Sequence, residues 1–342
     1  MGKRKKISGL SGSDSAIALM SMRALLDKMR REKELLAQSG TAQASEGEQA
    51  EDEGVAEEFD DELFSHMEKI IDMMSNRINS RDISFSSMNA NILAELGLDP
   101  ASADILKLKN NIAGIVTQSM ALGEDSLWSA SVLHRHLELL ERIVPQTNEA
   151  AARLWINAFF YRVAAMLPAE HPMVLSVEQP VPAVTLIRDG PATVSGTIDW
   201  VVMTAPPRTA ERLLGSPALG KDVQALFVTE AKSLNRGPAL LSHVPQALAE
   251  MCACARTAGR KVVRGALTNG HTWIFLIVKF EDKGISCSRA EPINIINLNA
   301  DTQNMSVSEY AVALISSILA HWMMHSHEDL RDDDHFVVKQ WS

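Results

Sequence analysis

The order of hydrophobic and polar positions divides the chain into a helical first part and a mixed second part. Near the N-terminus, apolar side chains recur at roughly helical spacing, with Arg and Lys between them, at Ile17, Met20, Leu25, Met29 and Leu36. Ser13 or Asp14 is a suitable N-cap for this helix. Because an isolated amphipathic helix is marginal in water, we expect it to bind a protein partner or the body of the protein.

Residues 62–145 favour helices as well. Apolar stripes run from Leu63 to Met74, from Leu106 to Val116 and from Leu127 to Val144, with little of the alternation that strands show. Stripes rich in Met are typical of cores and helix-packing surfaces rather than of ligand sites. The pattern therefore predicts a helical accessory region over residues 62–145, without chemistry of its own.

The pattern changes after Pro145. An amphipathic helix is predicted from Glu149 to Leu167. Short strands are predicted at 173–177, 181–187, 196–203 and 225–229, followed by a helix at 242–257 and strands at 262–267 and 272–280. The last two strands are joined through Asn269-Gly270, a strong hairpin signal. With a final helix near 306–324, residues 146–325 are expected to form an α/β domain.

Charge is distributed unevenly along the chain. Residues 46–62 hold ten Asp and Glu and no Lys or Arg, which equals the formal net charge of -10 of the whole chain. Such a stretch cannot bury enough apolar surface to order itself, so residues 1–61 are expected to be a largely disordered tail with one helix and an acidic linker. Residues 326–342, with the sequence HEDLRDDDH, are expected to form an acidic C-terminal tail.

The sequence also predicts where the protein is found. No apolar run approaches the roughly 18 residues of a membrane helix, and the start MGKRKK lacks the apolar core of a signal peptide. Three Cys without C-x-x-C spacing favour a reducing compartment. We expect an intracellular protein without a membrane segment, in the nucleus or the cytoplasm. The basic cluster Lys3, Arg4, Lys5 and Lys6 is either a nuclear import signal or a solubilising terminus.

One group of polar residues in the α/β domain suggests chemistry. Asp199 lies on a predicted strand, and Glu230, Ala231 and Lys232 lie at the end of the next one. Glu230 and Lys232 share one face of that strand, and the carbonyl of Ala231 stays accessible. Two carboxylates and a carbonyl are oxygen ligands of the kind that Mg²⁺ or Mn²⁺ prefers. A Lys beside such an ion can orient a water molecule and stabilise charge on a phosphate.

These residues resemble the motif of the PD-(D/E)XK nuclease superfamily. The resemblance covers about residues 149–280, and it implies a restriction-endonuclease-like αβββαβ core that hydrolyses phosphodiester bonds of nucleic acid, with DNA as the expected substrate. By this resemblance Asp199 and Glu230 bind the metal and Lys232 is the catalytic lysine. Glu149 matches a further supporting acid, and Gln246 matches a Gln on the second helix of the exonuclease-like branches. The alternative is an inactive module of the same fold that binds nucleic acid or protein.

The local charge around this motif suits a polyanionic partner. From Leu226 to Ala290 there are nine basic residues and four acidic ones. A run without acids, made of Arg256, Arg260, Lys261 and Arg264, is a candidate surface for phosphate groups. The alternative is that these residues interact with the C-terminus of the preceding helix and its dipole.

Two other groups have weaker signals. His321, His325 and His327 include a pair four residues apart on one helix face, either a metal pair or ordinary packing and surface residues. Cys252 and Cys254 lie two apart on a predicted helix and face different directions, as small core residues do.

Overall fold

The computed structural model describes most of the chain, and the described residues are 12–40, 64–72, 81–124, 127–145, 149–186, 192–218, 223–229, 240–282, 284–298 and 305–339. The chain divides into two compact units, Met1–Arg81 and Asp82–Ser342. The basic cluster from Lys3 to Lys6 and the acidic window 46–62 lie outside the described residues. None of the helices in the described stretches is both long and apolar enough to cross a membrane.

The first unit contains the helix predicted near the N-terminus. α1 runs over Gly12–Gly40 and includes the whole predicted stretch. A second helical segment covers residues 64–72. Leu19 and Leu26 of α1 form a small buried cluster with Ile71 of that segment. The helix is therefore confirmed, and part of its apolar side is covered within the same unit; the expected protein partner stays a prediction.

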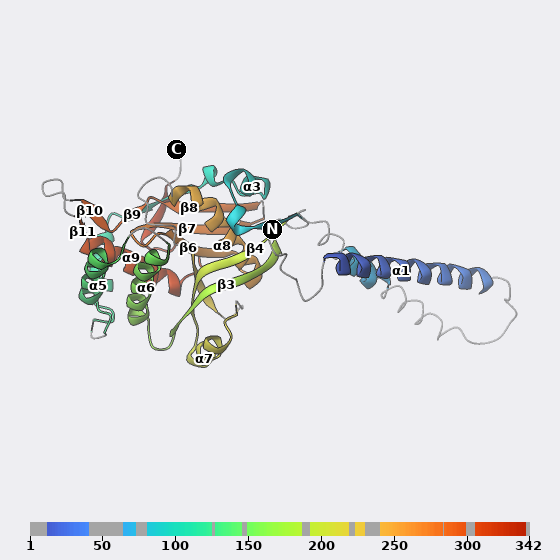
Figure 1. Cartoon of the computed structure of the whole chain (residues 1–342), viewed down its shortest axis with the longest axis horizontal. Helices are drawn as coiled ribbons and strands as arrows, with labels where there is room; N and C mark the ends of the chain where they lie inside the picture. The colour runs from blue at the N-terminus through green and yellow to red at the C-terminus, as the bar shows by residue number, and fades with distance from the viewer. Residues whose placement is uncertain are drawn as a thin grey trace. The chain divides into compact units, whose positions relative to one another are not determined.

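Ten described strands of the second unit form one mixed sheet (Figure 1). The hydrogen-bonded order is β1-β4-β5-β6-β7-β8-β2-β12, with β3 paired to β4 and β9 paired to β7. The strands are β1 (Arg81–Ser84), β2 (Asp104–Leu108), β3 (Met173–Thr185), β4 (Ala192–Thr204), β5 (Gln224–Thr229), β6 (Val262–Thr268), β7 (Thr272–Glu281), β8 (Gly284–Ala290), β9 (Ile293–Asn294) and β12 (Phe336–Lys339). A separate pair is formed by β10 (Ile296–Leu298) and β11 (Met305–Val307).

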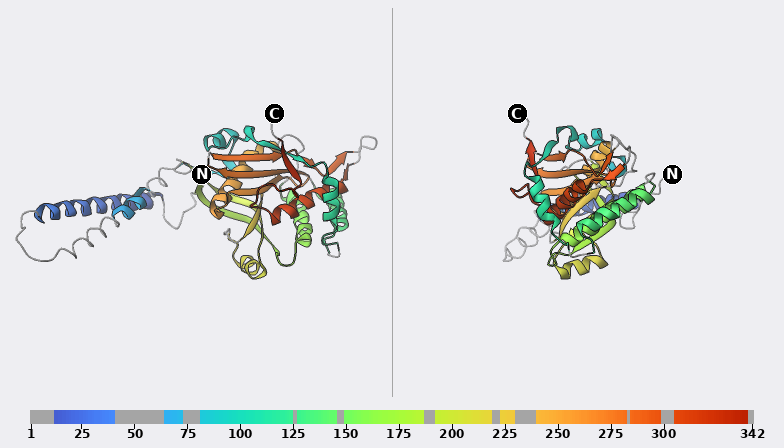
Figure 2. Two further views of the ribbon diagram at one scale, coloured as in Figure 1. Left: turned by 180° about the vertical axis from the view of Figure 1, so that it is seen from behind. Right: turned by 90° about the vertical axis from the view of Figure 1, so that its left-hand side faces the viewer.

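Helices pack against this sheet in two groups. The helices are α3 (Ala90–Glu95), α4 (Ile112–Met120), α5 (Ala130–Ile143), α6 (Glu149–Met166), α7 (Pro207–Gly215), α8 (Val244–Ala258) and α9 (Glu309–Met324), with short 3-10 turns at Phe85–Ser87, Pro100–Ser102 and Leu240–His243. α5, α6 and α9 contact one another and stay grouped in the views of Figures 1 and 2. Their apolar residues form one core cluster, and those of α3, α7 and α8 form another. The expected mixed α/β class is confirmed.

The middle of the sheet determines where the candidate residues lie. β3, β4 and β5 are successive antiparallel neighbours, and β6 then lies parallel to β5. Parallel neighbours need a crossover connection, and α8 lies in this one. α6 precedes β3, and the chain runs α6-β3-β4-α7-β5-α8-β6 through this part of the molecule, with the short helix α7 inserted between β4 and β5.

The hairpin between β6 and β7 forms at the predicted Asn-Gly turn. Asn269 Oδ1 accepts hydrogen bonds from the backbone N–H groups of His271, over 3.1 Å, and Thr272, over 2.8 Å. Gly270 has φ 88°, and a Cβ added there would lie 2.7 Å from the Cβ of Trp155 on α6. Only glycine meets both the left-handed backbone and this close approach. The turn therefore also places α6 against the sheet.

The predicted helical accessory region at 62–145 is wrong in two respects. Residues from Asp82 onward belong to the same unit as the α/β domain. β2, which includes Leu106 of the predicted second stripe, is a strand that lies between β8 and β12. Leu106 is buried in the main core cluster. It is apolar because β2 faces this core, and not because it lies on an amphipathic helix. α4 and α5 confirm the helical part of the prediction.

The predicted C-terminal tail at 326–342 is also wrong for its described residues. β12 pairs antiparallel with β2, with Val338 opposite Leu106. Asp334 and His335 are buried, at 0% and 1% exposure. Burial alone would raise the pKa of Asp334, but the nearby imidazole of His321 and the charge of Arg264 hold it well below its ordinary value. Burial lowers the pKa of His335 to about 4, and the charge of His321 acts in the same direction.

Candidate active site

Asp199 lies in the middle of β4, between two neighbouring strands. On one side, Trp200 pairs with Val177 and Ile198 with Gln179, which puts Glu178 of β3 opposite Asp199. On the other side, Trp200 pairs with Val228, which puts Thr229, the last residue of β5, opposite Asp199. The structure thus aligns Asp199 with a second acid and with the end of β5.

Arg153 of α6 joins the two acids. Its Nη1 donates to Oε1 of Glu178 over 3.0 Å, and its Nη2 donates to Oδ1 of Asp199 over 3.2 Å. The Asp199 side chain is 17% exposed and that of Arg153 31%, so the pair is partly shielded from water. One helical turn further along α6, Asn157 accepts a 3.0 Å hydrogen bond from the indole of Trp200. This bond holds α6 against β4 at the position of the ion pairs.

The backbone of Glu178 has an unusual conformation. Its φ is 55°, the only positive φ of a non-glycine residue in the described chain. A non-glycine residue in this region costs about 1–3 kcal/mol, and such residues are concentrated at functional sites. Neither Glu178 nor Arg153 is among the residues predicted from the sequence. The signal for Glu178 was the gap between the predicted strands 173–177 and 181–187, which the structure joins into the single strand β3.

The structure describes the remaining residues of the predicted motif only in part. Glu230, Ala231 and Lys232 lie outside the described residues, directly after the end of β5 at Thr229. Glu149 begins α6, four positions before Arg153 on the same helix face, and its side chain is outside the described part of the structure. The structure therefore places the backbone of Glu149 and the end of β5 at Thr229, the residue before Glu230 in the sequence.

Gln246 lies on α8, which packs against the second core cluster. Its side chain is 9% exposed and donates a 2.9 Å hydrogen bond from Nε2 to Oε1 of Glu250, itself 1% exposed. A buried amide paired with a buried carboxylate has a defined orientation. Gln246 is thus held by Glu250, one turn along the same helix.

The four basic residues expected to contact phosphate have different environments. The guanidinium of Arg256 donates to the carbonyl of Leu186, over 2.6 Å from Nη2, and lies 4.4 Å from the ring centroid of Phe280. Arg260 donates to the carbonyl of Val223 over 3.2 Å. Lys261 is exposed. Arg256 and Arg260 thus have structural contacts, while Lys261 is open to a partner.

The prediction that Arg264 contacts phosphate is wrong. Its side chain is fully buried, and Nη1 donates to Oδ2 of Asp334 over 2.7 Å. Its other donors reach the carbonyls of Glu328, over 3.2 Å, and Asp329, over 2.9 Å. A fully buried guanidinium whose three nitrogens each donate inside the protein is not available to a ligand.

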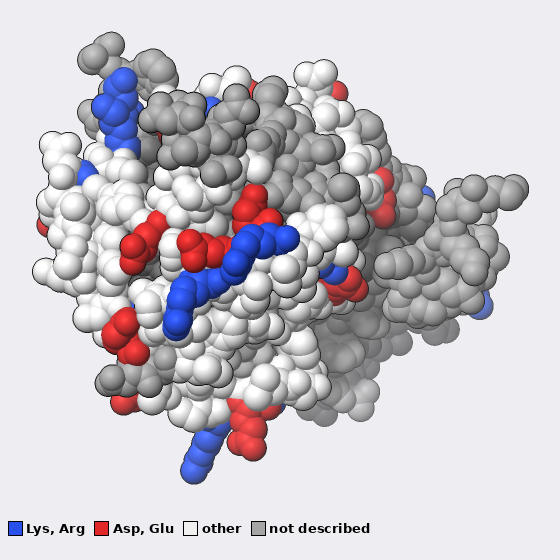
Figure 3. All heavy atoms as spheres, turned by 60° about the vertical axis from the view of Figure 1, so that its left-hand side comes forward, with Lys and Arg blue, Asp and Glu red and all other residues white. Residues whose placement is uncertain are grey.

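Charge on the visible surface is mixed. Figure 3 shows a face on which Lys and Arg side chains lie beside Asp and Glu side chains, surrounded by mostly uncharged surface. The described atoms of this face therefore form no uniformly basic patch. A long polyanion would meet charges of both signs there.

The structure separates the three predicted His residues. His321 lies on α9 and His325 directly after it. His327 instead has its Nδ1 3.3 Å from the carbonyl of Val262. Burial lowers the pKa of His327 to about 4, helped by the charge of Arg260. His321 and His325 thus remain as a pair without His327.

Comparison with models of known protein families gives no match, and comparison with curated proteins gives none either. The function is therefore argued from the geometry of Asp199 and its neighbours.

Proposed function

We propose that this chain is a divalent-metal-dependent phosphodiesterase of the PD-(D/E)XK type that acts on nucleic acid, with DNA as its substrate. The register of β4 and β5 carries the proposal: Asp199 is opposite Thr229, so Glu230 and Lys232 follow the residue aligned with it. Apart from α7, which is inserted between β4 and β5, the order α6-β3-β4-β5-α8-β6, with β5 and β6 parallel, supports it as well. It is the order expected of an αβββαβ core.

The residues present fit a cation with oxygen ligands. The carboxylates of Asp199 and Glu178 both contact one cationic group, the guanidinium of Arg153. In the proposed site, Asp199, Glu230 and the carbonyl of Ala231 hold Mg²⁺ or Mn²⁺, ions that prefer such ligands. When bound, the ion supplies positive charge that polarises the phosphate and lowers the pKa of water.

The other side chains have positioning and proton-transfer roles in this proposal. Lys232 orients the attacking water and stabilises charge on the phosphate oxygens. Glu149 and Gln246 assist in positioning. Arg153, once its carboxylate partners bind the ion, presents a planar fork of donors that suits a phosphate group.

One observation favours a second candidate function. The single guanidinium of Arg153 pairs with both carboxylates, at 3.2 Å from Asp199 and 3.0 Å from Glu178. If the protein keeps these ion pairs permanently, it is an inactive nuclease-like module. The exposed Lys261 and the surfaces near it then bind nucleic acid or protein. The two functions differ in whether a metal replaces the guanidinium.

The test is a substrate panel. The purified full chain is incubated with linear, circular and single-stranded DNA and with RNA, in Mg²⁺, in Mn²⁺ and in EDTA, beside Asp199→Ala and Lys232→Ala. Cleavage that requires the metal and is lost in both variants supports the nuclease. Cleavage that survives both substitutions contradicts the proposed site. Salt-sensitive binding without cleavage in any metal supports the inactive module.

A further inference from the structure

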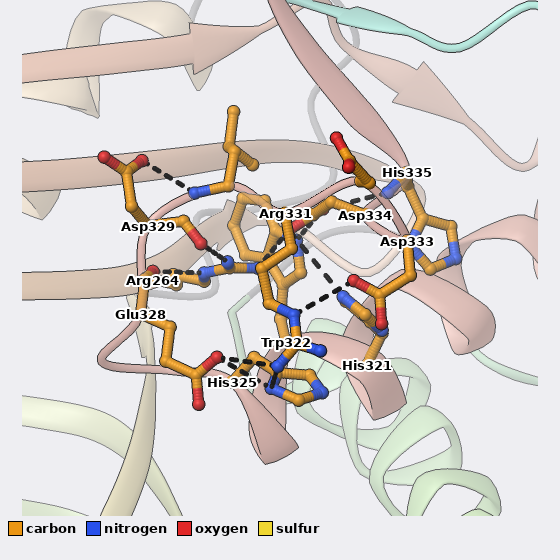
Figure 4. A network of polar contacts seen from close by, with 12 residues as sticks. Arg264, His321, Trp322, His325, Glu328, Asp329, Arg331, Asp333, Asp334 and His335 are labelled. Carbon is orange, nitrogen blue, oxygen red and sulfur yellow. Dashed lines mark hydrogen bonds and ion pairs between the residues drawn. The ribbon is translucent and has the colours of Figure 1, made fainter.

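A second group of side chains with cation-binding chemistry lies where α9 ends. His321 and His325 are four residues apart, and Asp333 belongs to the loop that precedes β12 (Figure 4). One potential ligand atom from each of the three lies within 4.8 Å of the others. The two imidazole centroids are 4.7 Å apart. Residues from two parts of the chain thus meet in one small volume.

Each imidazole lies beside a carboxylate. Nε2 of His321 is buried and lies 3.7 Å from Oδ2 of Asp334, and Nδ1 of His325 lies 3.1 Å from Oε2 of Glu328. A His that binds a metal typically presents its other ring nitrogen to a carboxylate, which fixes the ring and raises its basicity. His325 meets this pattern at hydrogen-bond distance, while the contact of His321 is longer than a hydrogen bond.

The loop that carries Asp333 is held in place before any ligand binds. Arg264, buried beneath it, donates to the carbonyls of Glu328 and Asp329 and to the carboxylate of Asp334. Lys109 Nζ donates to the carbonyls of Arg331, over 3.2 Å, and Asp332, over 2.6 Å. A preorganised loop reduces the entropic cost of binding.

We propose that His321, His325 and Asp333 bind one transition-metal ion of the Zn²⁺ type, including Co²⁺ and Ni²⁺. Two imidazoles and one carboxylate suit these ions, while Mg²⁺ and Ca²⁺ prefer oxygen ligands alone. A water molecule completes the coordination. The ion links the end of α9 to the loop before β12.

Arg331 affects the strength of this site. Its Nε donates to Oδ1 of Asp333 over 3.1 Å, and its Nη1 lies 3.3 Å from Nδ1 of His325. Oδ2 of Asp333 is left for the ion. The guanidinium places a positive charge beside the bound metal, which weakens binding by repulsion.

The test is metal binding to the untagged full chain. Zn²⁺ is titrated calorimetrically and Co²⁺ by visible absorption, in excess Mg²⁺ so that sites with only oxygen ligands are filled. The three Cys are buried, so they do not compete in the folded protein. We expect one ion per chain, and a loss of affinity of at least about 10-fold in both His325→Asn and Asp333→Asn. His327→Asn is the matched control, and its affinity should equal that of the wild type.

Three results would overturn the assignment. They are the absence of stoichiometric binding to the wild type, wild-type affinity in His325→Asn and Asp333→Asn, and an equal loss in His327→Asn. Asp333 is exposed, so its variant is expected to fold, which circular dichroism checks. Arg331→Gln should bind the metal several-fold more tightly than the wild type. Unchanged or weaker binding in that variant would place the ion elsewhere.

Discussion

Arg153 on α6 and Asp199 on β4 form an ion pair in which Nη2 lies 3.2 Å from Oδ1. The same guanidinium binds Glu178, so one cation serves two carboxylates on neighbouring strands. In the proposed enzyme Arg153 and the divalent ion compete for the same carboxylates, because both are cations.

Replacing Arg153 should therefore change how the protein responds to metal. Arg153→Gln should lower the free energy of unfolding by about 1 kcal/mol in EDTA, since the partly shielded carboxylate of Asp199 and the exposed one of Glu178 both lose their partner. Mg²⁺ should then stabilise the variant more than the wild type, because the ion no longer competes with the guanidinium. Urea denaturation with and without Mg²⁺ measures both effects. The exposed Arg142→Gln is the control, and equal stabilisation of all three proteins would contradict the account.

The backbone of Glu178 gives a separate prediction. Glu178→Gly and Glu178→Ala both remove the carboxylate, but only glycine adopts φ 55° without strain. Glu178→Gly should therefore be more stable than Glu178→Ala by about 1 kcal/mol. At Lys107, in the ordinary strand β2, glycine should instead be the less stable of the two. Chemical denaturation measures the free energy of unfolding of the Gly and Ala variants at each position. If the two variants have the same order of stability at both positions, the result argues against strain at Glu178.

The buried pair of Arg264 and Asp334 should contribute strongly to stability. Asp334→Asn leaves the guanidinium of Arg264 buried without its counter-charge, and such a change costs about 3–5 kcal/mol. The control is Asp333→Asn, whose exposed pair with Arg331 is worth at most about 1 kcal/mol. Thermal and urea denaturation in the absence of transition metals measure both. If the free energy of unfolding falls by a similar small amount in the two variants, the result would contradict the burial of the Arg264–Asp334 pair.

The thiols should be unreactive while the protein is folded. All three Cys are buried, and burial raises the pKa of Cys252 and Cys254 and that of Cys287 to about 11. A higher pKa lowers the thiolate fraction at pH 8, and the thiolate is the reactive form. A chromogenic disulfide reagent should label three thiols in denaturant and none promptly under native conditions. Rapid native labelling would show that these residues are not in the core.

Local features of the fold were predictable from the sequence, and features that depend on distant partners were not. The turn at Asn269 and Gly270 follows from residues next to one another. β2 and β12 are different, because their pairing joins Leu106 to Val338, which lie far apart in the sequence. The acidic segment near Asp334 resembled a solvated tail because its counter-charge, Arg264, lies 70 positions away.

The candidate site shows the same limit. The sequence identified Asp199 by its place on a strand, but the contacts with Arg153 and Glu178 depend on how α6 and β3 pack against β4. The basic run predicts phosphate contacts for Arg264 from charge alone, and charge does not report that this side chain is buried. Its place between Val263 and Gly265 in a buried strand was the contrary signal.

The central claim is that Asp199 belongs to a metal-dependent catalytic site. Its most direct test is the Mg²⁺-dependent rate of DNA cleavage by the wild type, by Asp199→Asn and by Asp82→Asn. Asp82 is the matched control, an Asp on the neighbouring strand β1 that accepts hydrogen bonds from the hydroxyls of Thr193 and Ser195. The account predicts at least about a 100-fold lower rate in Asp199→Asn and a near wild-type rate in Asp82→Asn. Cleavage by Asp199→Asn at the wild-type rate would contradict it.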